Sequence, residues 1–164
     1  MKIGIVKEIK PCEYRVGATP TAVTELTRRG HEVYVETMAG VGSGFMDEEY
    51  DEAGAIMVDN AKEVWDTVDM MVKVKEPLPE EYPLFHEGLI LYTYLHLAAD
   101  KQQTDALLEA QVKGVAYETL YDPKNGGLPL LAPMSQIAGR LSIQEGAKYL
   151  EKIYGGAGVL LSGV

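Results

Sequence analysis

Short apolar runs alternate with amphipathic segments at least five times along the chain, and this alternation constrains the fold more than any other feature. The runs expected to form strands are residues 2–8, 31–37, 55–58, 69–75, 88–96 and 115–120. The segments expected to form helices are residues 21–29, 47–54, 61–67, 100–114 and 134–154. Strands that alternate with helices in this way predict an α/β fold, a parallel sheet with helices on both faces. The expected domain is Rossmann-like or flavodoxin-like.

Charged side chains follow several of the expected strands. Arg15 lies in the loop after the first strand and Lys75 ends the fourth. His96 ends the fifth strand, and Glu118 lies within the sixth. Because ligands of open parallel sheets bind beyond the carboxyl ends of the strands, we expect these side chains to converge. Two cations can clamp a carboxylate and an imidazole can exchange a proton with a carbonyl or hydroxyl, so the pattern predicts a site for a small 2-oxo or 2-amino acid.

Each of these residues also has a purely structural interpretation. A single loop arginine such as Arg15 is usually solvated, and Glu118 could merely neutralise a nearby cation. Lys73, two residues before Lys75 on the same strand face, is either a second ligand or a charge at the rim. His96 lies in an apolar setting and could be a core histidine.

The charge balance excludes broad nucleic-acid binding. Fifteen basic and 25 acidic residues give a formal net charge of −10, and such a surface repels polyphosphate. An anionic ligand must therefore meet a few well-placed cations. Cys12 is the only cysteine, so an internal disulfide and a cysteine-rich metal site are excluded, and we expect no metal. No window approaches the roughly 18 apolar residues of a membrane helix, and we expect a cytoplasmic protein that binds no membrane.

Two glycine-rich stretches raise the question of a nucleotide site. Residues 40–45, GVGSGF, lack the G-x-G-x-x-G spacing and precede the acidic run DEEYDE, which would repel a pyrophosphate. Residues 155–163 have no preceding strand. The first stretch is interpreted as a turn, in which glycine serves the backbone, and neither stretch is a strong signal for a nucleotide site.

Several longer runs resemble one family of oxidoreductases. GIVKEIKPCEYRVGATPTAVTELTRRGHEV, residues 4–33, resembles the N-terminal signature shared by alanine dehydrogenases and the alpha part of proton-translocating transhydrogenases. VKVKEP, LYTYLHLA, VAYET, the run from LPLLAPMSQ to KYLEK and YGGAGVLLSGV look like alanine dehydrogenase specifically. The histidine-bearing LHLA favours the amino-acid enzyme over the transhydrogenase.

The resemblance implies roles for individual residues. Arg15 and Lys75 would bind the carboxylate of pyruvate or L-alanine, and His96 would be the catalytic acid or base at the substrate oxygen. The resemblance also implies that Tyr94 and Met134 line the substrate pocket. Ser135 would contact the nicotinamide cofactor, NAD. The implied reaction is the NAD-dependent interconversion of L-alanine and pyruvate.

The resemblance also implies a domain organisation. Residues 1–133 would form the substrate domain, and residues 134–164 a connecting helix and the start of an inter-domain link. The NAD-binding domain, with most of the cofactor site and a second catalytic aspartate, would lie beyond Val164, so the chain is expected to be an N-terminal fragment without turnover of its own. The full-length family member would be a homo-oligomer, a hexamer.

Three alternatives remain open at this point. A transhydrogenase-type domain would pass hydride between two dinucleotides and would use no amino acid. A non-catalytic module would bind a small carboxylate as a sensor or regulatory subunit, and its natural chain would stop near Val164. A structural fragment would have a pocket that collapses without the rest of the protein.

Overall fold

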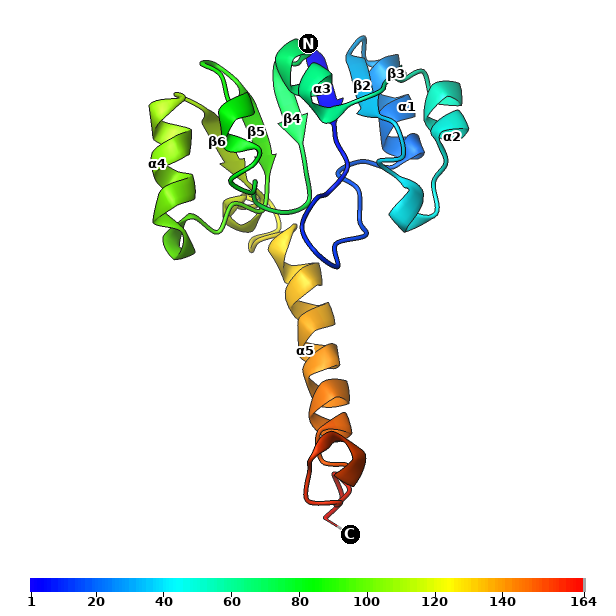
Figure 1. The fold of residues 1–164 in the computed structure, drawn as a ribbon, viewed down its shortest axis with the longest axis vertical. Coiled ribbons are helices and arrows are strands. Elements are labelled where there is room, and N and C mark those ends of the chain that lie inside the picture. The colour runs from blue at the N-terminus through cyan, green and yellow to red at the C-terminus, as the bar shows by residue number, and fades with distance from the viewer. Residues whose placement is uncertain (164) are drawn as a thin grey trace. The chain divides into compact units, whose positions relative to one another are not determined.

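The computed structural model describes residues 1–163 and divides into two compact units, Met1–Glu118 and the residues from Thr119 onward (Figure 1). The first unit holds all six strands, and the second holds one long helix. Each unit is described by itself.

The first unit is built on a six-stranded, fully parallel sheet. Its strands are β1 (Lys2–Ile5), β2 (Glu32–Glu36), β3 (Ile56–Val58), β4 (Met70–Val72), β5 (Ile90–Thr93) and β6 (Lys113–Ala116). Their order in the sheet is β3-β2-β1-β4-β5-β6. The predicted α/β parallel sheet is confirmed. The chain moves outward to β3 and then returns to place β4 beside β1, so the β1–β4 boundary is the switch point at which ligands of such sheets bind.

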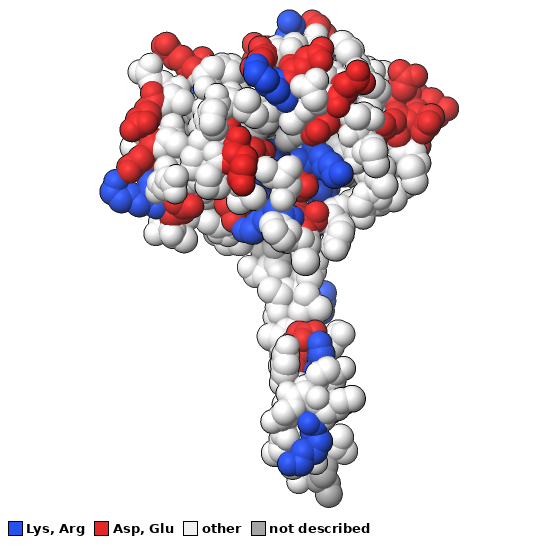
Figure 2. Space-filling view, in the orientation of Figure 1, with Lys and Arg blue, Asp and Glu red and all other residues white. Residues whose placement is uncertain are grey.

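Helices cover both faces of this sheet, as right-handed crossovers require when the strand order reverses. The helices of the unit are α1 (Pro20–Arg28), α2 (Asp47–Glu52), α3 (Ala61–Thr67) and α4 (Lys101–Glu109). One buried cluster joins Val23 of α1 and Tyr50 of α2 to β1 and β2. The other joins Trp65 of α3 and Leu107 of α4 to β4 and β5. Figure 1 shows α2 and α4 at opposite edges of the sheet, and Figure 2 shows acidic side chains crowded over α2, the segment DEEYDE.

The local start and stop signals explain where these elements begin and end. Thr19 caps α1 by accepting a hydrogen bond from the backbone N–H of Ala22 at 3.3 Å, and Pro20 occupies the first helical position, as the sequence predicts. The helix expected over residues 100–114 is shorter, because Gln111 adopts a left-handed conformation with φ 54° and β6 already begins at Lys113. The strand expected over residues 115–120 accordingly ends early, and residues 117–119 form a 3₁₀ turn, η4.

The second unit contains α5 (Leu131–Lys148), which begins three residues before the expected position and is followed by the 3₁₀ turn η5 (Lys152–Tyr154). None of the side chains of α5 is buried. In the described part of the chain, no helix combines the length and the apolar character needed to cross a membrane.

Close packing between β1 and α3 leaves no room for a side chain at Gly4. A Cβ atom there would lie 2.7 Å from Val64 Cγ1 and 3.0 Å from Val68 Cγ2, both in the buried core. Met71, on the neighbouring strand β4, closes the third side at 3.1 Å. The missing side chain therefore lets α3 pack directly on the central strand.

We expect Gly4→Ala to destabilise the first unit by about 1 to 3 kcal/mol, because the added methyl group overpacks a core that cannot expand freely. Trp65, the single tryptophan of the chain, is buried in this unit, so its fluorescence during urea unfolding reports this unit. Gly139→Ala in α5 is the matched control, since nothing lies within 4 Å of its added Cβ. Equal unfolding midpoints for Gly4→Ala and the parent would contradict this account of the packing.

Candidate functional site

A buried carboxylate joins the ends of the two strands at the switch point. Glu8 follows β1, and its Oε1 accepts the backbone N–H of Val74 at 2.6 Å and that of Lys75 at 3.4 Å. Burial raises the pKa of Glu8, while the charge of Lys73 and the two backbone hydrogen bonds partly offset that rise. The segment that carries Lys75 is thus held against the end of β1.

Lys73 lies at the centre of this arrangement. Its side chain is fully buried, and its Nζ lies 2.8 Å from Glu81 Oε1 and 3.4 Å from Glu8 Oε2. Glu81 in turn accepts the backbone N–H of Leu78 at 2.9 Å. Lys73 is therefore neither a ligand nor a charge at the rim, the two roles considered from its sequence position. It is the cation of a buried cluster, Glu8–Lys73–Glu81, that fixes the loop after β4.

Arg15 lies in the loop after β1, paired with Glu13. Its Nε and Nη2 donate to the two oxygens of Glu13 at 2.8 and 2.6 Å. The hydrogen bond from Arg15 lowers the pKa of Glu13 to about 2, and the charge of Lys75 adds to this effect. The same hydrogen bond raises the pKa of Arg15, with smaller contributions from the charges of Glu13, Tyr94 and Glu8. The Glu13–Arg15 ion pair is therefore the strongest influence on both of these groups.

A second cation, Lys75, lies in the segment after β4 and is less exposed than Arg15. Its Nζ lies 3.4 Å from Glu76 Oε2, and 23% of its side chain is accessible, against 50% for Arg15. Glu76 also forms an ion pair with Lys10 from the loop after β1. A small cavity of about 70 Å³ opens on the other side of Arg15, lined in part by Glu13 and Gly42.

Aromatic side chains pack beside His96. The rings of Tyr94 and His96 stack with 6.1 Å between their centroids, and the edge of Tyr117 meets the ring of Tyr94 at 4.9 Å. Tyr117 also meets Tyr92 at 4.3 Å. Burial raises the pKa of Tyr94, and the positive charge of Arg15 opposes that rise. His96 itself is exposed, which excludes the alternative of a core histidine.

Arg15, Lys75 and His96 follow β1, β4 and β5 of the same parallel sheet, and the His96 ring stacks on Tyr94. Their convergence on one ligand stays a prediction. Glu118 differs from expectation, because its carboxylate pairs with neither cation. It accepts backbone N–H groups instead, from His96 at 2.7 Å and from Leu95 at 3.1 Å.

Met134 and Ser135 belong to α5 in the second unit. Met134 is partly buried and Ser135 is exposed. Their proposed contacts with substrate and cofactor stay predictions.

Two functional neighbours were missed from the sequence. Glu8 and Glu81 are the buried partners of Lys73, and both belong to charged stretches that look solvated. A signal did exist, because a lysine within the apolar run MMVKV needs buried carboxylates if its strand lies inside a sheet.

The described residues do not fit the pyrophosphate of a dinucleotide. The strand order matches that of dinucleotide-binding folds, but the loop after β1 holds Glu13 and Arg15 where such folds have a glycine-rich turn. The glycine-rich segment after β2 is a 3₁₀ turn, Val41–Ser43, that leads into the acidic first turn of α2. In residues 1–163, no group of three or more His, Cys, Asp or Glu side chains could hold a metal ion.

Comparisons with known proteins all identify the same family. The model of the alanine dehydrogenase/PNT N-terminal domain matches residues 4–138. An alanine dehydrogenase of Bilophila wadsworthia is 60% identical over 99% of this chain and 43% of that protein. One of Staphylococcus epidermidis is 56% identical over 100% of this chain and 44% of that protein. The chain therefore spans less than half the length of these curated relatives.

Solved structures agree with this result. An L-alanine dehydrogenase structure matches with a TM-score of 0.87 and 53% identity, covering 100% of this chain and 45% of that one. A transhydrogenase from Sinorhizobium meliloti matches less well, with a TM-score of 0.69 and 28% identity over 75% of this chain and 35% of that one.

The Glu13–Arg15 pair should stabilise the chain only above acid pH. Since the folded-state pKa of Glu13 is about 2 and its ordinary value is 4.5, the contribution is complete above pH 4.5 and disappears as the pH falls towards 2. Half of the Arg15 side chain is exposed. After solvent screening we expect this contribution to be about 1 kcal/mol.

The free energy of unfolding of the parent should therefore fall more steeply between pH 4.5 and pH 3 than that of Glu13→Gln, measured by urea unfolding with Trp65 fluorescence. Glu25→Gln, which removes the exposed partner of Arg29, is the control and should follow the parent. Parallel acid profiles for Glu13→Gln and the parent would refute this assignment.

Lys73→Met should destabilise the first unit by about 3 to 5 kcal/mol, because Glu8 and Glu81 lose their buried cation. The deficit should shrink as the pH falls, since burial raises the pKa of Glu8 and its protonation removes part of the uncompensated charge. Lys62→Met removes only an exposed pair with Asp66 and should change stability by less than about 1 kcal/mol. A deficit for Lys73→Met that is independent of pH would show that lost packing, not charge, causes the instability.

Proposed function

Because the chain belongs to the alanine dehydrogenase/PNT N-terminal domain family, we propose that it is the substrate-binding part of an NAD-dependent L-alanine dehydrogenase. In that reaction L-alanine, NAD⁺ and water give pyruvate, ammonium, NADH and a proton. The observation that supports the proposal is that Arg15 and Lys75 follow the two strands of the switch point, β1 and β4, while His96 follows the next strand, β5.

The substrate carboxylate would bind to Arg15 and Lys75. Glu13 holds the Arg15 guanidinium in a fixed plane, and Glu8 holds the backbone of Lys75, so both cations are oriented before a ligand arrives. A preorganised site lowers the ordering cost of binding. In a chain with a net charge of −10, this local pair supplies the attraction that the surface as a whole does not.

His96 would hold or release the proton at the substrate oxygen. His96 is exposed and its ring lies against Tyr94, whose pKa responds to the charge of Arg15. A ligand bound through its carboxylate at Arg15 would then present its oxo group to the Tyr94–His96 pair. An imidazole there can donate to a carbonyl and accept from a hydroxyl in the reverse direction.

The cofactor would bind mainly outside these residues. The chain covers 43% to 45% of its alanine dehydrogenase relatives, and residues 1–163 provide no pyrophosphate cradle. We therefore propose that NAD is held mostly by a domain that follows residues 134–164 in the complete protein, with Ser135 contributing one contact and Met134 lining the substrate pocket. On this basis the chain by itself has no turnover. A hexameric full-length protein and a cytoplasmic location stay predictions.

The transhydrogenase alternative receives weaker support. The matched transhydrogenase is 28% identical to this chain, whereas the alanine dehydrogenases are 53% to 60% identical. His96 and Tyr94 are also suited to a small oxo acid, which a transhydrogenase does not need. Binding of pyruvate separates the two functions.

We expect the chain to bind pyruvate saturably in a calorimetric titration. Lys75→Met should weaken binding by about tenfold or more, because it removes one charge-assisted contact with the carboxylate. Lys113→Met, at an exposed lysine of β6, removes the same charge and should bind as the parent does. His96→Ala should weaken binding of pyruvate but not of acetate, which has a carboxylate and no oxo group.

The proposal fails if pyruvate binding is unaffected by Lys75→Met, or if it is weakened equally by Lys113→Met. Equal effects of His96→Ala on pyruvate and acetate would contradict the role of His96 at the oxo group while leaving the carboxylate site intact.

A further inference from the structure

The peptide group between Leu95 and His96 is held at both of its polar atoms by side chains from other elements. From this geometry we propose that Glu118 and Gln103 are positioning residues, which fix the backbone of His96 and thereby aim its imidazole at the substrate oxygen. The inference deepens the proposed function and rests on it for the identity of the substrate.

The contacts form a clamp on the turn after β5. The Leu95 carbonyl accepts a hydrogen bond from Gln103 Nε2 in α4 at 2.9 Å. The His96 N–H donates to Glu118 Oε1 in η4 at 2.7 Å. The Leu95 N–H donates to the same carboxylate, at 3.1 Å from Oε1 and 3.3 Å from Oε2. Gln103 lies in the first turn of α4 and Glu118 lies in η4, after β6, so two different elements hold this peptide.

The conformation that the clamp maintains is an unfavourable one. His96 has φ 49° and ψ 36°, in the left-handed region that residues other than glycine rarely adopt. Such a residue costs about 1 kcal/mol or more and persists only where its surroundings impose it. Its own carbonyl accepts a single backbone bond, from Ala99 at 3.0 Å. The side-chain contacts of Glu118 and Gln103 are therefore the restraints on the peptide that precedes His96.

Burial of the Gln103 side chain costs free energy, and this cost supports its role as a positioning residue. The side chain is fully buried, and its Oε1 has no hydrogen-bond partner among the described residues. A buried amide oxygen without a partner costs about 1 to 3 kcal/mol, and an apolar side chain of the same size would avoid that cost. The contribution of the glutamine is therefore its donor, which holds the Leu95 carbonyl.

The imidazole has no comparable restraint of its own. Within Met1–Glu118, the His96 ring forms no hydrogen bond, and its one ring contact is the stack on Tyr94. Catalytic histidines are commonly oriented by a hydrogen bond to the second ring nitrogen. In this unit the direction of the ring instead depends on the backbone at His96, so the clamp determines where the proton-transfer group points.

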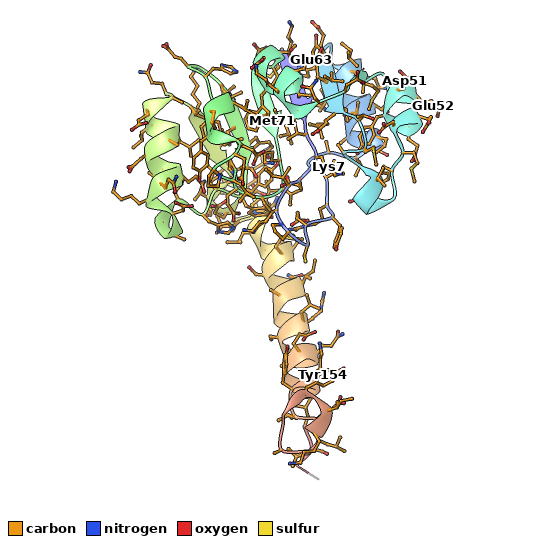
Figure 3. All side chains as sticks on the ribbon, in the orientation of Figure 1. Lys7, Asp51, Glu52, Glu63, Met71 and Tyr154 are labelled. Atoms are coloured by element: carbon orange, nitrogen blue, oxygen red, sulfur yellow. The ribbon has the colours of Figure 1, made fainter. Side chains whose placement is uncertain are left out.

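The test compares Glu118→Ala, Glu118→Gln and Gln103→Met with the parent chain by NMR. Two signals of the free protein are measured, namely the His96 ring resonance and the rate of amide exchange at His96. Pyruvate affinity is then measured by titration. Glu52→Ala is the control for loss of one negative charge, because Glu52 projects outward from α2 (Figure 3). His31 and His86 serve as internal references for effects unrelated to the clamp.

We expect Glu118→Ala and Gln103→Met to shift the His96 ring resonance and to speed its amide exchange by about tenfold or more, with His31 and His86 unchanged. Pyruvate should bind about three- to tenfold more weakly, because the competent orientation of His96 is less populated. Glu118→Gln keeps an acceptor oxygen and should retain most of the parent behaviour. Glu52→Ala should match the parent.

The clamp is refuted if Glu118→Ala is folded and its His96 signals and exchange equal those of the parent. If Glu118→Ala does not fold, Gln103→Met and Glu118→Gln decide by the same signals, and parent-like values in Gln103→Met refute the proposal. The His96 signals are measured without ligand. If the parent fails to bind pyruvate, the proposed function fails, while the His96 signals still test the clamp separately.

Discussion

The fixed point of the structure is the buried ion cluster Glu8–Lys73–Glu81 at the place where β1 and β4 lie side by side. Charges with so little access to water are tolerated only when they are paired, and the pairing of both carboxylates with Lys73 ties three segments together. Glu8 follows β1, Lys73 follows β4 and Glu81 precedes the 3₁₀ turn Tyr82–Leu84. The loops that carry Arg15 and Lys75 both emerge from this point, so the geometry of the candidate site depends on the cluster.

In the candidate site, the residues that hold the site in place differ from the residues that are proposed to contact the ligand. Glu8 holds the backbone of Lys75, Glu13 holds the guanidinium of Arg15, and Glu118 holds the backbone of His96. In each case a carboxylate supports a side chain that faces the proposed ligand. The acidic composition of the chain thus contributes to an anion site, because several acidic groups near it are engaged in orienting cations and backbone. The strand order alone would have suggested a dinucleotide, and the loop residues after β1 argue against that reading.

Much of the fold followed from local sequence signals. The alternation of strands and helices gave the parallel sheet, and Thr19-Pro20 gave the start of α1, because caps and periodicity act over a few residues. The predicted end of α4 was wrong, because the chain adopts a left-handed conformation at Gln111, where the sequence has no glycine to indicate it. For the site, topology predicts that Arg15, Lys75 and His96 converge, because each of them follows a strand of one parallel sheet, and this convergence stays a prediction. The partners of Lys73 and the backbone role of Glu118 did not follow from the sequence, because they depend on specific side-chain contacts between residues 8 to 66 positions apart.

The central claim is that a small oxo acid binds at the switch point of the sheet, between the loops after β1, β4 and β5. It is tested most directly by following the backbone amide signals of the chain during a titration with pyruvate. The account predicts saturable shifts for the amides of Arg15, Lys75 and His96 with one common affinity, and unchanged signals along α2. Saturable shifts confined to another surface, or no shift at any of these three residues, would contradict it.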